Sequence, residues 1–297
     1  FRFFLFLITC RYFNRQPLLT CWLIPSGTNG KLKIGSFIPK SNIYCFRMPT
    51  LRLFVFGWVI GLGWLPIRMY GQEPDKLSAF YLNQMAVQTL HTDPKQALAY
   101  AQQALQAAKQ VGDSAMQAKA LLNLGSAHFQ LAQYDRALTF YLNALNINQK
   151  TGDWKGESNA YHNIGNVYLY RDQYPKAIEF YERSRQIDLV HGDEKSASTT
   201  LHSIANAYSY FDENRAIETY REALPVFRQL KDTLSESMTL NNLGNLYLSR
   251  KQYDKSLVYF EQCLQLNRLL KDDEGTATNL ENIGNVYRGK KQYDKAI

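Results

Sequence analysis

The chain has 297 residues, of which 45% are hydrophobic, and a formal net charge of +8. This length suits two ordinary domains or one long repeat array, and the composition is that of a globular protein. Residues 1–72 hold nine of the 34 basic side chains and no Asp or Glu, so the remainder of the chain is close to neutral. Because phosphate binding needs clustered cations on a folded surface, we expect no nucleic-acid partner.

The first segment, residues 1–47, begins with Phe1 and precedes the first methionine, Met48. We interpret it as untranslated sequence or the result of a misassigned start, the alternative being a disordered extension. Three of the four cysteines fall in this segment and only Cys263 lies in the remainder. That distribution predicts neither a disulfide framework nor a paired CxxC metal site.

Residues 48–71 have the order of a secretory signal peptide, with a short basic start, an apolar run over 53–65, and small and polar residues around Gly71. The apolar run is shorter than the about 20 residues that a membrane span requires. Cleavage near Gly71 or Gln72 is therefore favoured over an uncleaved membrane anchor across 51–70. Either alternative predicts a secreted or periplasmic bacterial protein, attached to the membrane only in the second case.

From residue 77 onward the chain repeats itself with a period of 40 residues. The small residue that follows a repeated Leu or Ile recurs at Gly125, Gly165, Ala205, Gly244 and Gly284. A second series of small residues and a series of loop aspartates share these spacings, including a single step of 39. Three series with one common short step indicate a true repeat that carries a one-residue deletion, which we place in the turn at 210–214.

Within each unit the apolar residues follow helical spacing, and the intervening loops contain helix-terminating residues. Pro94 and Pro175 stand where second helices begin, at positions that need no backbone N–H. Three glycines, each followed by Asp, suit a left-handed helix end and a helix-start acceptor: Gly112, Gly152 and Gly192. Each unit is therefore predicted to contain two helices of about 14 to 16 residues, or about 20 to 24 Å in length.

These residues resemble the tetratricopeptide repeat family, whose pattern is met by "YHNIGNVY" and "QYPKAIEFYERS" within Tyr161–Ser184. The resemblance covers 77–297, with five full units and a sixth cut off at Ile297. Its period of 40 is longer than the usual period of about 34 and is similar to that of Pins-type G-protein-signalling modulators and bacterial tetratricopeptide signalling proteins. The resemblance implies an all-α, right-handed superhelical solenoid of antiparallel helix pairs, with first helices lining a concave groove that binds peptides or partner proteins.

The unit at Ser196–Leu230 fits the family pattern worst. Ser203 and Ala205 replace Asn and Gly, the turn is one residue shorter, and Pro225 falls inside the second helix. Because proline removes one backbone hydrogen bond, we expect a bend in that helix and a local change in the pitch of the superhelix.

The resemblance places the residue two before each repeated Gly, and the residue one after it, on the groove side. Asparagine predominates there, at Asn123, Asn163, Asn166, Asn206, Asn242, Asn245, Asn282 and Asn285. An asparagine column would offer donors and acceptors to the main chain of a bound peptide. The alternative is that duplication copied a packing or capping asparagine that has no binding role.

The position just before the first asparagine of each pair carries no Lys or Arg in the five units, so we expect no clamp for a terminal carboxylate. His162 and His202 occupy this position in neighbouring units. We interpret them as solvent-facing lining of the groove rather than as a metal pair or a pH-sensitive contact. Cys263 aligns with three alanines and a serine and is expected to be a small core residue rather than a nucleophile. We predict no metal and no cofactor.

The sequence therefore predicts a non-enzymatic module that binds a protein or peptide. The alternative is the extracytoplasmic sensory region of a larger bacterial signalling enzyme, a sensor histidine kinase or nucleotide cyclase, because the repeat stops at Ile297 without a capping helix. No zincin motif, nucleophile elbow or kinase signature is found. The sequence makes no prediction about the oligomeric state.

Overall fold

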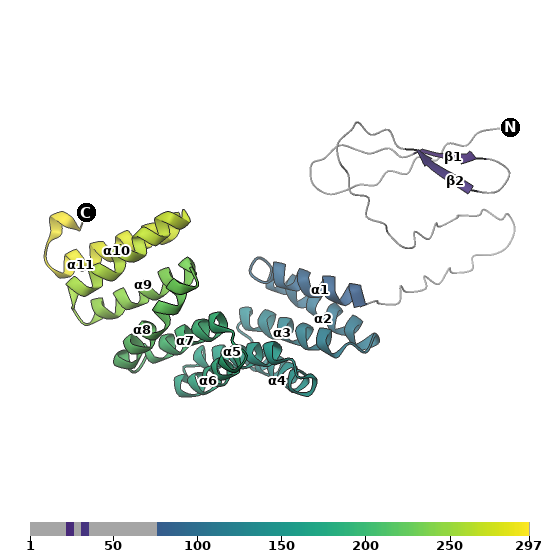
Figure 1. The fold of residues 1–297 in the computed structure, drawn as a ribbon, viewed down its shortest axis with the longest axis horizontal. Helices are drawn as coiled ribbons and strands as arrows, with labels where there is room; N and C mark the ends of the chain where they lie inside the picture. The colour runs from purple at the N-terminus through teal and green to yellow at the C-terminus, as the bar shows by residue number, and fades with distance from the viewer. Residues whose placement is uncertain (1–21, 27–30, 36–75, 297) are drawn as a thin grey trace. The chain divides into compact units, whose positions relative to one another are not determined.

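The computed structural model of the protein describes residues 22–26, 31–35 and 76–296. The chain divides into two compact units, residues 1–68 and 69–297, which are described separately. Within the first, β1 (Trp22–Ser26) and β2 (Lys31–Gly35) form an antiparallel pair, which the sequence analysis did not predict (Figure 1). The interpretation of 1–47 as non-native stays a prediction, and the proposed signal or anchor segment, 48–71, lies outside the described residues.

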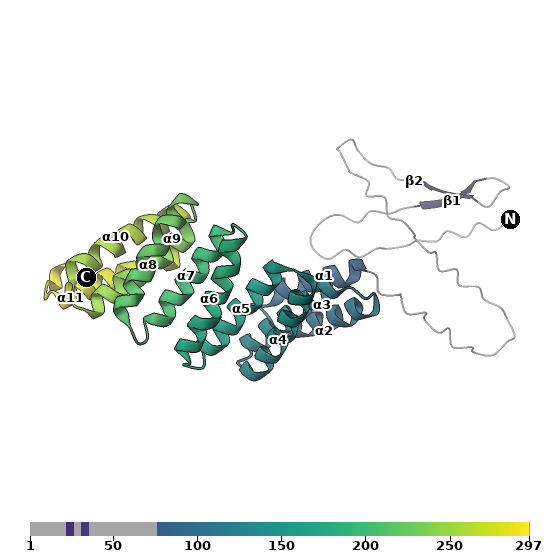
Figure 2. The ribbon, with the colours of Figure 1, turned by 60° about the horizontal axis from the view of Figure 1, so that its bottom comes forward.

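The second compact unit is built from α-helices, as predicted, and ends in a short 3-10 turn. The elements are α1 (Lys76–Thr89), α2 (Pro94–Gln110), α3 (Ser114–Gln130), α4 (Tyr134–Thr151), α5 (Trp154–Leu169), α6 (Tyr174–Val190), α7 (Glu194–Tyr208), α8 (Glu213–Gln229), α9 (Thr233–Ser249), α10 (Tyr253–Leu270), α11 (Asp273–Gly289) and η1 (Tyr293–Lys295). Each helix packs on the next along the chain, and Figures 1 and 2 show the pairs stacked in a curved row. We number the repeat units from α1–α2 as unit one to α9–α10 as unit five.

The predicted helix boundaries rest on capping. Asp113, Asp153, Asp193, Asp232 and Asp272 each accept a hydrogen bond from the backbone N–H three residues further on, at 2.9–3.2 Å. The preceding glycines are left-handed where they occur, with φ of 67°, 71° and 73°. Pro94 is the first residue of α2, and Pro175 is the second residue of α6. The helix-start and helix-end residues identified in the sequence are therefore confirmed.

The repeated glycine lets the two helices of a unit approach closely. A Cβ atom added to Gly165 would lie 2.5 Å from a ring carbon of Tyr181, a distance that no real side chain tolerates. Gly125 faces Tyr141 in the same way, and Gly244 faces Phe260. These rings are buried, so units two, three and five each have an aromatic side chain of the second helix packed on a glycine of the first.

Neighbouring units also meet through their first helices, which places the odd-numbered helices on the inner side of the curve. The backbones of α1 and α3, of α3 and α5, and of α9 and α11 approach one another, and α5 and α7, like α7 and α9, make fewer such approaches. The looser packing therefore surrounds α7, in the unit that the sequence marks as irregular. Helix α8 of that unit runs on through Pro225.

The predicted deletion removes one residue from the turn between α7 and α8. The corresponding turns of units two, three and five each contain a non-glycine residue with positive φ: Ala132, Asp172 and Lys251. The turn before α8 has no such residue. Instead, the backbone N–H of Asp212 donates to the carbonyl of Tyr208 at 2.7 Å. Asp212 also caps α8 through its side chain, whereas Gln173 and Gln252 do not cap their helices.

Candidate functional site

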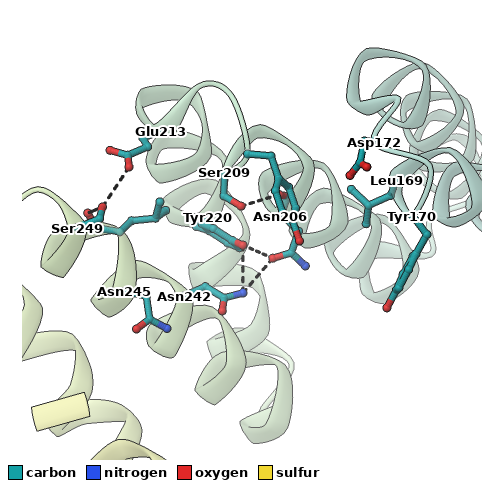
Figure 3. A pocket seen from close by; sticks show the side chains of 12 residues that line it. Leu169, Tyr170, Asp172, Asn206, Ser209, Glu213, Tyr220, Asn242, Asn245 and Ser249 are labelled. Carbon is teal, nitrogen blue, oxygen red and sulfur yellow. Dashed lines mark hydrogen bonds between the residues drawn. The ribbon is translucent and has the colours of Figure 1, made fainter. Parts of the chain in front are cut away.

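The inner face opens into a cavity of about 750 Å³ beside α7. It is lined by Leu169, Tyr170, Asp172, Asn206, Ser209, Tyr210, Glu213, Tyr220, Asn242, Asn245, Leu246 and Ser249. Figure 3 shows side chains from α5, α7, α8 and α9 arranged around it. Three of the eight predicted groove asparagines, Asn206, Asn242 and Asn245, lie here together, while the other five do not line this cavity.

One wall of the cavity is a fixed triangle of polar groups. The Tyr220 hydroxyl donates to Asn206 Oδ1, and Asn242 Nδ2 donates to the same oxygen and to the Tyr220 hydroxyl, at 3.0 Å each (Figure 3). Burial raises the pKa of Tyr220, so its hydroxyl remains a donor. The triangle joins α7, α8 and α9 and uses the oxygen of Asn206 and the nitrogen of Asn242.

This tyrosine contact is itself part of the repeat. Tyr141 donates to Ser126 in unit two at 3.2 Å, and Tyr181 donates to Asn166 in unit three at 2.6 Å. Unit five has Phe260 at the equivalent position, which has no hydroxyl to donate. The Asn245 side chain is accordingly exposed and makes no hydrogen bond with the described residues. It is the free amide of the cavity.

The remaining predicted groove residues mostly bond within the protein. Asn123 Nδ2 donates to Asn83 Oδ1 at 2.8 Å, and Asn282 Nδ2 donates to Asn241 Oδ1 at 3.1 Å, each linking consecutive odd helices. Asn285 accepts from Arg288 of its own helix, whereas Asn163 has no hydrogen-bond partner in the described part of the chain. The packing role that the sequence left as an alternative therefore describes Asn123 and Asn282.

The two histidines each contact a threonine of the following unit. The expectation that they face solvent is wrong for His202. His202 is 8% exposed, and its Nδ1 lies 2.9 Å from Thr239 Oγ1 of the next unit, while His162 Nδ1 lies 3.2 Å from Thr200 Oγ1. Thr239 donates its own proton to the Ser235 carbonyl, so His202 Nδ1 must donate to Thr239.

Burial lowers the pKa of both His162 and His202 to about 4. The other ring nitrogen of His202, Nε2, lies 3.4 Å from Asn242 Nδ2, whose two protons have closer acceptors in Asn206 and Tyr220. Protonation of Nε2 would therefore set two donors against each other. Each histidine bonds to a threonine of the following unit rather than to the other histidine, which is the arrangement of a packing residue.

Nine of the twelve cavity residues were not predicted from the sequence, although the repeat contained a signal for two of them. Glu213 stands where units two, three and five have tyrosine, and Asp172 stands where units two and five have Ala132 and Lys251. Tyr170 and Tyr210, at equivalent turn positions in units three and four, are 62% and 64% exposed. Departures from the repeat, rather than its shared residues, thus give the cavity its charge.

The predicted core role of Cys263 is confirmed, since its thiol is buried among Ser237, Asn267 and Asn279. Among the described residues, no cluster of three or more His, Cys, Asp or Glu side chains could hold a metal ion. In the same part of the chain, no helix has both the length and the apolar character needed to cross a membrane.

Helix pairs that stack on their neighbours with a 40-residue period define an α-solenoid. A family model described as the tetratricopeptide repeat matches residues 79–150, 116–189, 156–229 and 235–297. These matches cover most of the chain, and the protein belongs to the tetratricopeptide repeat family. No curated protein matches the chain.

Solved structures share this fold at low sequence identity. BtubC (BKLC) from P. vanneervenii is 22% identical with a TM-score of 0.57, over 74% of this chain and 84% of its own. Aspartyl phosphate phosphatase F from Bacillus subtilis is 13% identical with a TM-score of 0.61, over 74% and 67%. NprR in complex with its cognate peptide NprX is 17% identical with a TM-score of 0.53, over 74% and 64%. At these identities the likeness concerns the fold alone.

Proposed function

We propose that the protein is a non-enzymatic interaction module that binds an extended peptide segment of a partner on its inner face, at the cavity beside α7. The observation that carries the proposal is the combination of a large inner cavity with an uncommitted amide, Asn245, on its wall. An amide that offers both donors and an acceptor can bond to the main chain of a peptide without requiring a particular side chain.

The size and the rigidity of the cavity support this function. A volume of about 750 Å³ lies within the roughly 300–1,000 Å³ typical of ligand sites. Asn206, Asn242 and Tyr220 are already held by one another, so one wall needs no rearrangement when a peptide binds. A preformed wall reduces the ordering cost that opposes association.

The comparisons support the same class of ligand without defining it. One structure with the fold is of NprR with a peptide, and another is of a Rap protein complexed with competence and sporulation factor. Both belong to other proteins at 17% and 16% identity. They indicate that a solenoid of this fold is compatible with binding of a ligand of this kind.

A selection from a random peptide library displayed on phage, with the full chain as bait, tests the proposal. Peptides that emerge are titrated against the wild type, Asn245→Ala, and the control Asn143→Ala, which changes another exposed asparagine, on the even-numbered helix α4. We expect Asn245→Ala to weaken binding about fivefold or more, since one direct hydrogen bond is worth about 1 kcal/mol. Equal affinity for all three proteins, or no selected peptide, would contradict the proposal.

A second candidate is the sensory region of a larger bacterial signalling enzyme, secreted or held at the membrane through 51–70. It is favoured by the signal-like order of 48–71 ahead of a peptide-sized cavity, and by the fold shared with NprR of B. thuringiensis, which is described as a quorum sensor. A coding sequence that continues past Ile297 into about 20 apolar residues and a heptad-patterned linker would support this candidate. A stop codon soon after the sixth unit would oppose it.

A further inference from the structure

Resting on the proposed peptide site, we infer that the cavity beside α7 selects a basic side chain, arginine or lysine, in the bound peptide. Of the twelve residues that line the cavity, the two that carry charge, Asp172 and Glu213, are both acidic. The rest are amides, hydroxyls, tyrosines and leucines. A peptide that enters this cavity meets negative charge and aromatic rings.

Asp172 is the cavity carboxylate that is available to a bound peptide. Glu213 is paired with Arg250, whose Nε lies 2.8 Å from Glu213 Oε2, and it also accepts from Ser249 at 3.1 Å. The pair with Arg250 lowers the pKa of Glu213 but uses much of its charge. Asp172 is exposed, accepts from the Tyr174 hydroxyl at 2.7 Å, and has no basic partner in the described part of the chain.

The rings around Asp172 complete a site for a cation. Tyr174, which bonds to Asp172, is stacked on Tyr210 with a centroid distance of 4.7 Å and an interplanar angle of 4°. Tyr170 and Tyr210 both present exposed rings to the cavity rim. A guanidinium or ammonium group beside a carboxylate and over tyrosine rings gains ionic and cation–π attraction together.

The negative charge belongs to this one place in the solenoid. Asp172 adopts φ of 57° in a turn where Ala132, Lys251 and Lys291 adopt φ of 56°, 58° and 60°. Lysine at that position would reverse the charge without altering the turn. The repeat therefore offers two substitutions that its own backbone accommodates, Asp172→Ala and Asp172→Lys.

The test uses the full chain and peptides selected from the random library. Each basic residue of a selected peptide is replaced by an uncharged isostere, citrulline for arginine or acetyl-lysine for lysine, and affinities are measured for the wild type, Asp172→Ala, Asp172→Lys and the control Lys251→Ala. We expect one basic residue whose replacement weakens wild-type binding about three- to tenfold, which is the range expected for an exposed ion pair with a cation–π contact. The same replacement should have no effect on binding to Asp172→Ala, and Asp172→Lys should bind the basic peptide most weakly.

Selected peptides that bind the cavity, as shown by sensitivity to Asn245→Ala, but lack a basic residue would overturn the inference and leave the proposed function in place. Equal losses in the wild type and Asp172→Ala would also overturn it, because the basic residue would then contact another part of the protein. If no peptide is selected, the proposed function fails and this inference fails with it.

Discussion

Unit three, α5–α6, and unit four, α7–α8, show what a regular repeat builds and what a departure from it builds. In unit three, Gly165 receives the ring of Tyr181, and the turn passes through a left-handed residue. In unit four, Ala205 replaces the glycine, the turn loses its left-handed residue, and α7 makes fewer close backbone approaches to the inner helices on either side. Regular units close the core, and the cavity opens where the irregular unit interrupts them.

The histidine contacts that connect unit four to its neighbours should make the stability of the protein sensitive to acid. His162 and His202 have pKa values of about 4 when folded, below the ordinary value of 6.5, so the unfolded chain binds protons first as pH falls. The stability that the neutral histidines contribute is complete above about pH 6.5 and is lost toward pH 4, with a loss at pH 5 of about 2 kcal/mol per histidine. Denaturant unfolding at pH 7 and pH 5 measures this change in the free energy of unfolding.

In the double variant His162→Asn, His202→Asn, the amide keeps a donor for each threonine but does not titrate. Its loss of unfolding free energy between pH 7 and pH 5 should be smaller than that of the wild type by about 4 kcal/mol. An unchanged pH dependence would show that the two histidines are not buried contacts between units.

Gly165→Leu tests the close packing of the two helices in the regular unit three. Overpacking against Tyr181 should lower the free energy of unfolding by about 3 kcal/mol, measured by urea denaturation. The matched change in the irregular unit, Ala205→Gly, should cost about 1 kcal/mol, from helix propensity. A wild-type midpoint for Gly165→Leu would argue against the close helix contact on which each regular unit depends.

Asp188→Asn should stabilise the junction between units three and four by about 1 kcal/mol at pH 7. Asp188 is 2% exposed, its Oδ2 has no partner among the described residues, and burial raises its pKa, although a Ser158 hydrogen bond opposes this. The equivalent residues of units two and five are the neutral Asn148 and Asn267. Because the folded carboxyl holds its proton more tightly than the unfolded one, ionisation of Asp188 destabilises the folded state as pH rises above 3.8. This destabilisation is absent below that pH. A melting temperature for Asp188→Asn that is equal to or below that of the wild type at pH 7 would refute this.

Phe260→Tyr should have the smallest effect on stability, a gain of about 0.5 kcal/mol. It restores to unit five the hydroxyl that Tyr181 and Tyr220 present to Asn166 and Asn206. Asn245 would then acquire a partner, so affinity for selected peptides should fall about as far as in Asn245→Ala. Unchanged affinity, with the new hydrogen bond verified in a crystal structure, would mean that Asn245 does not serve the guest.

The sequence predicts the helix pairs, their caps and the site of the deletion, because these depend on local backbone preferences and on a spacing that repeats. It does not predict which asparagines are free, since that depends on residues across the helix pair, such as Phe260 in place of tyrosine. The burial of His202 was not predicted for a similar reason, because it depends on a contact with Thr239 of the next unit. The charge of the cavity could have been found by asking where the repeat fails, at Asp172 and Glu213.

The most direct test of the account is a photocrosslink from the protein to a selected peptide. A benzophenone amino acid replaces Tyr210 on the cavity rim, or Leu269, which is 77% exposed on α10 and does not line the cavity. We expect crosslinking from position 210 and none from position 269, with the product from 210 reduced when Asn245→Ala is added. Crosslinking from position 269 and not from 210 would place the binding surface elsewhere and contradict the account.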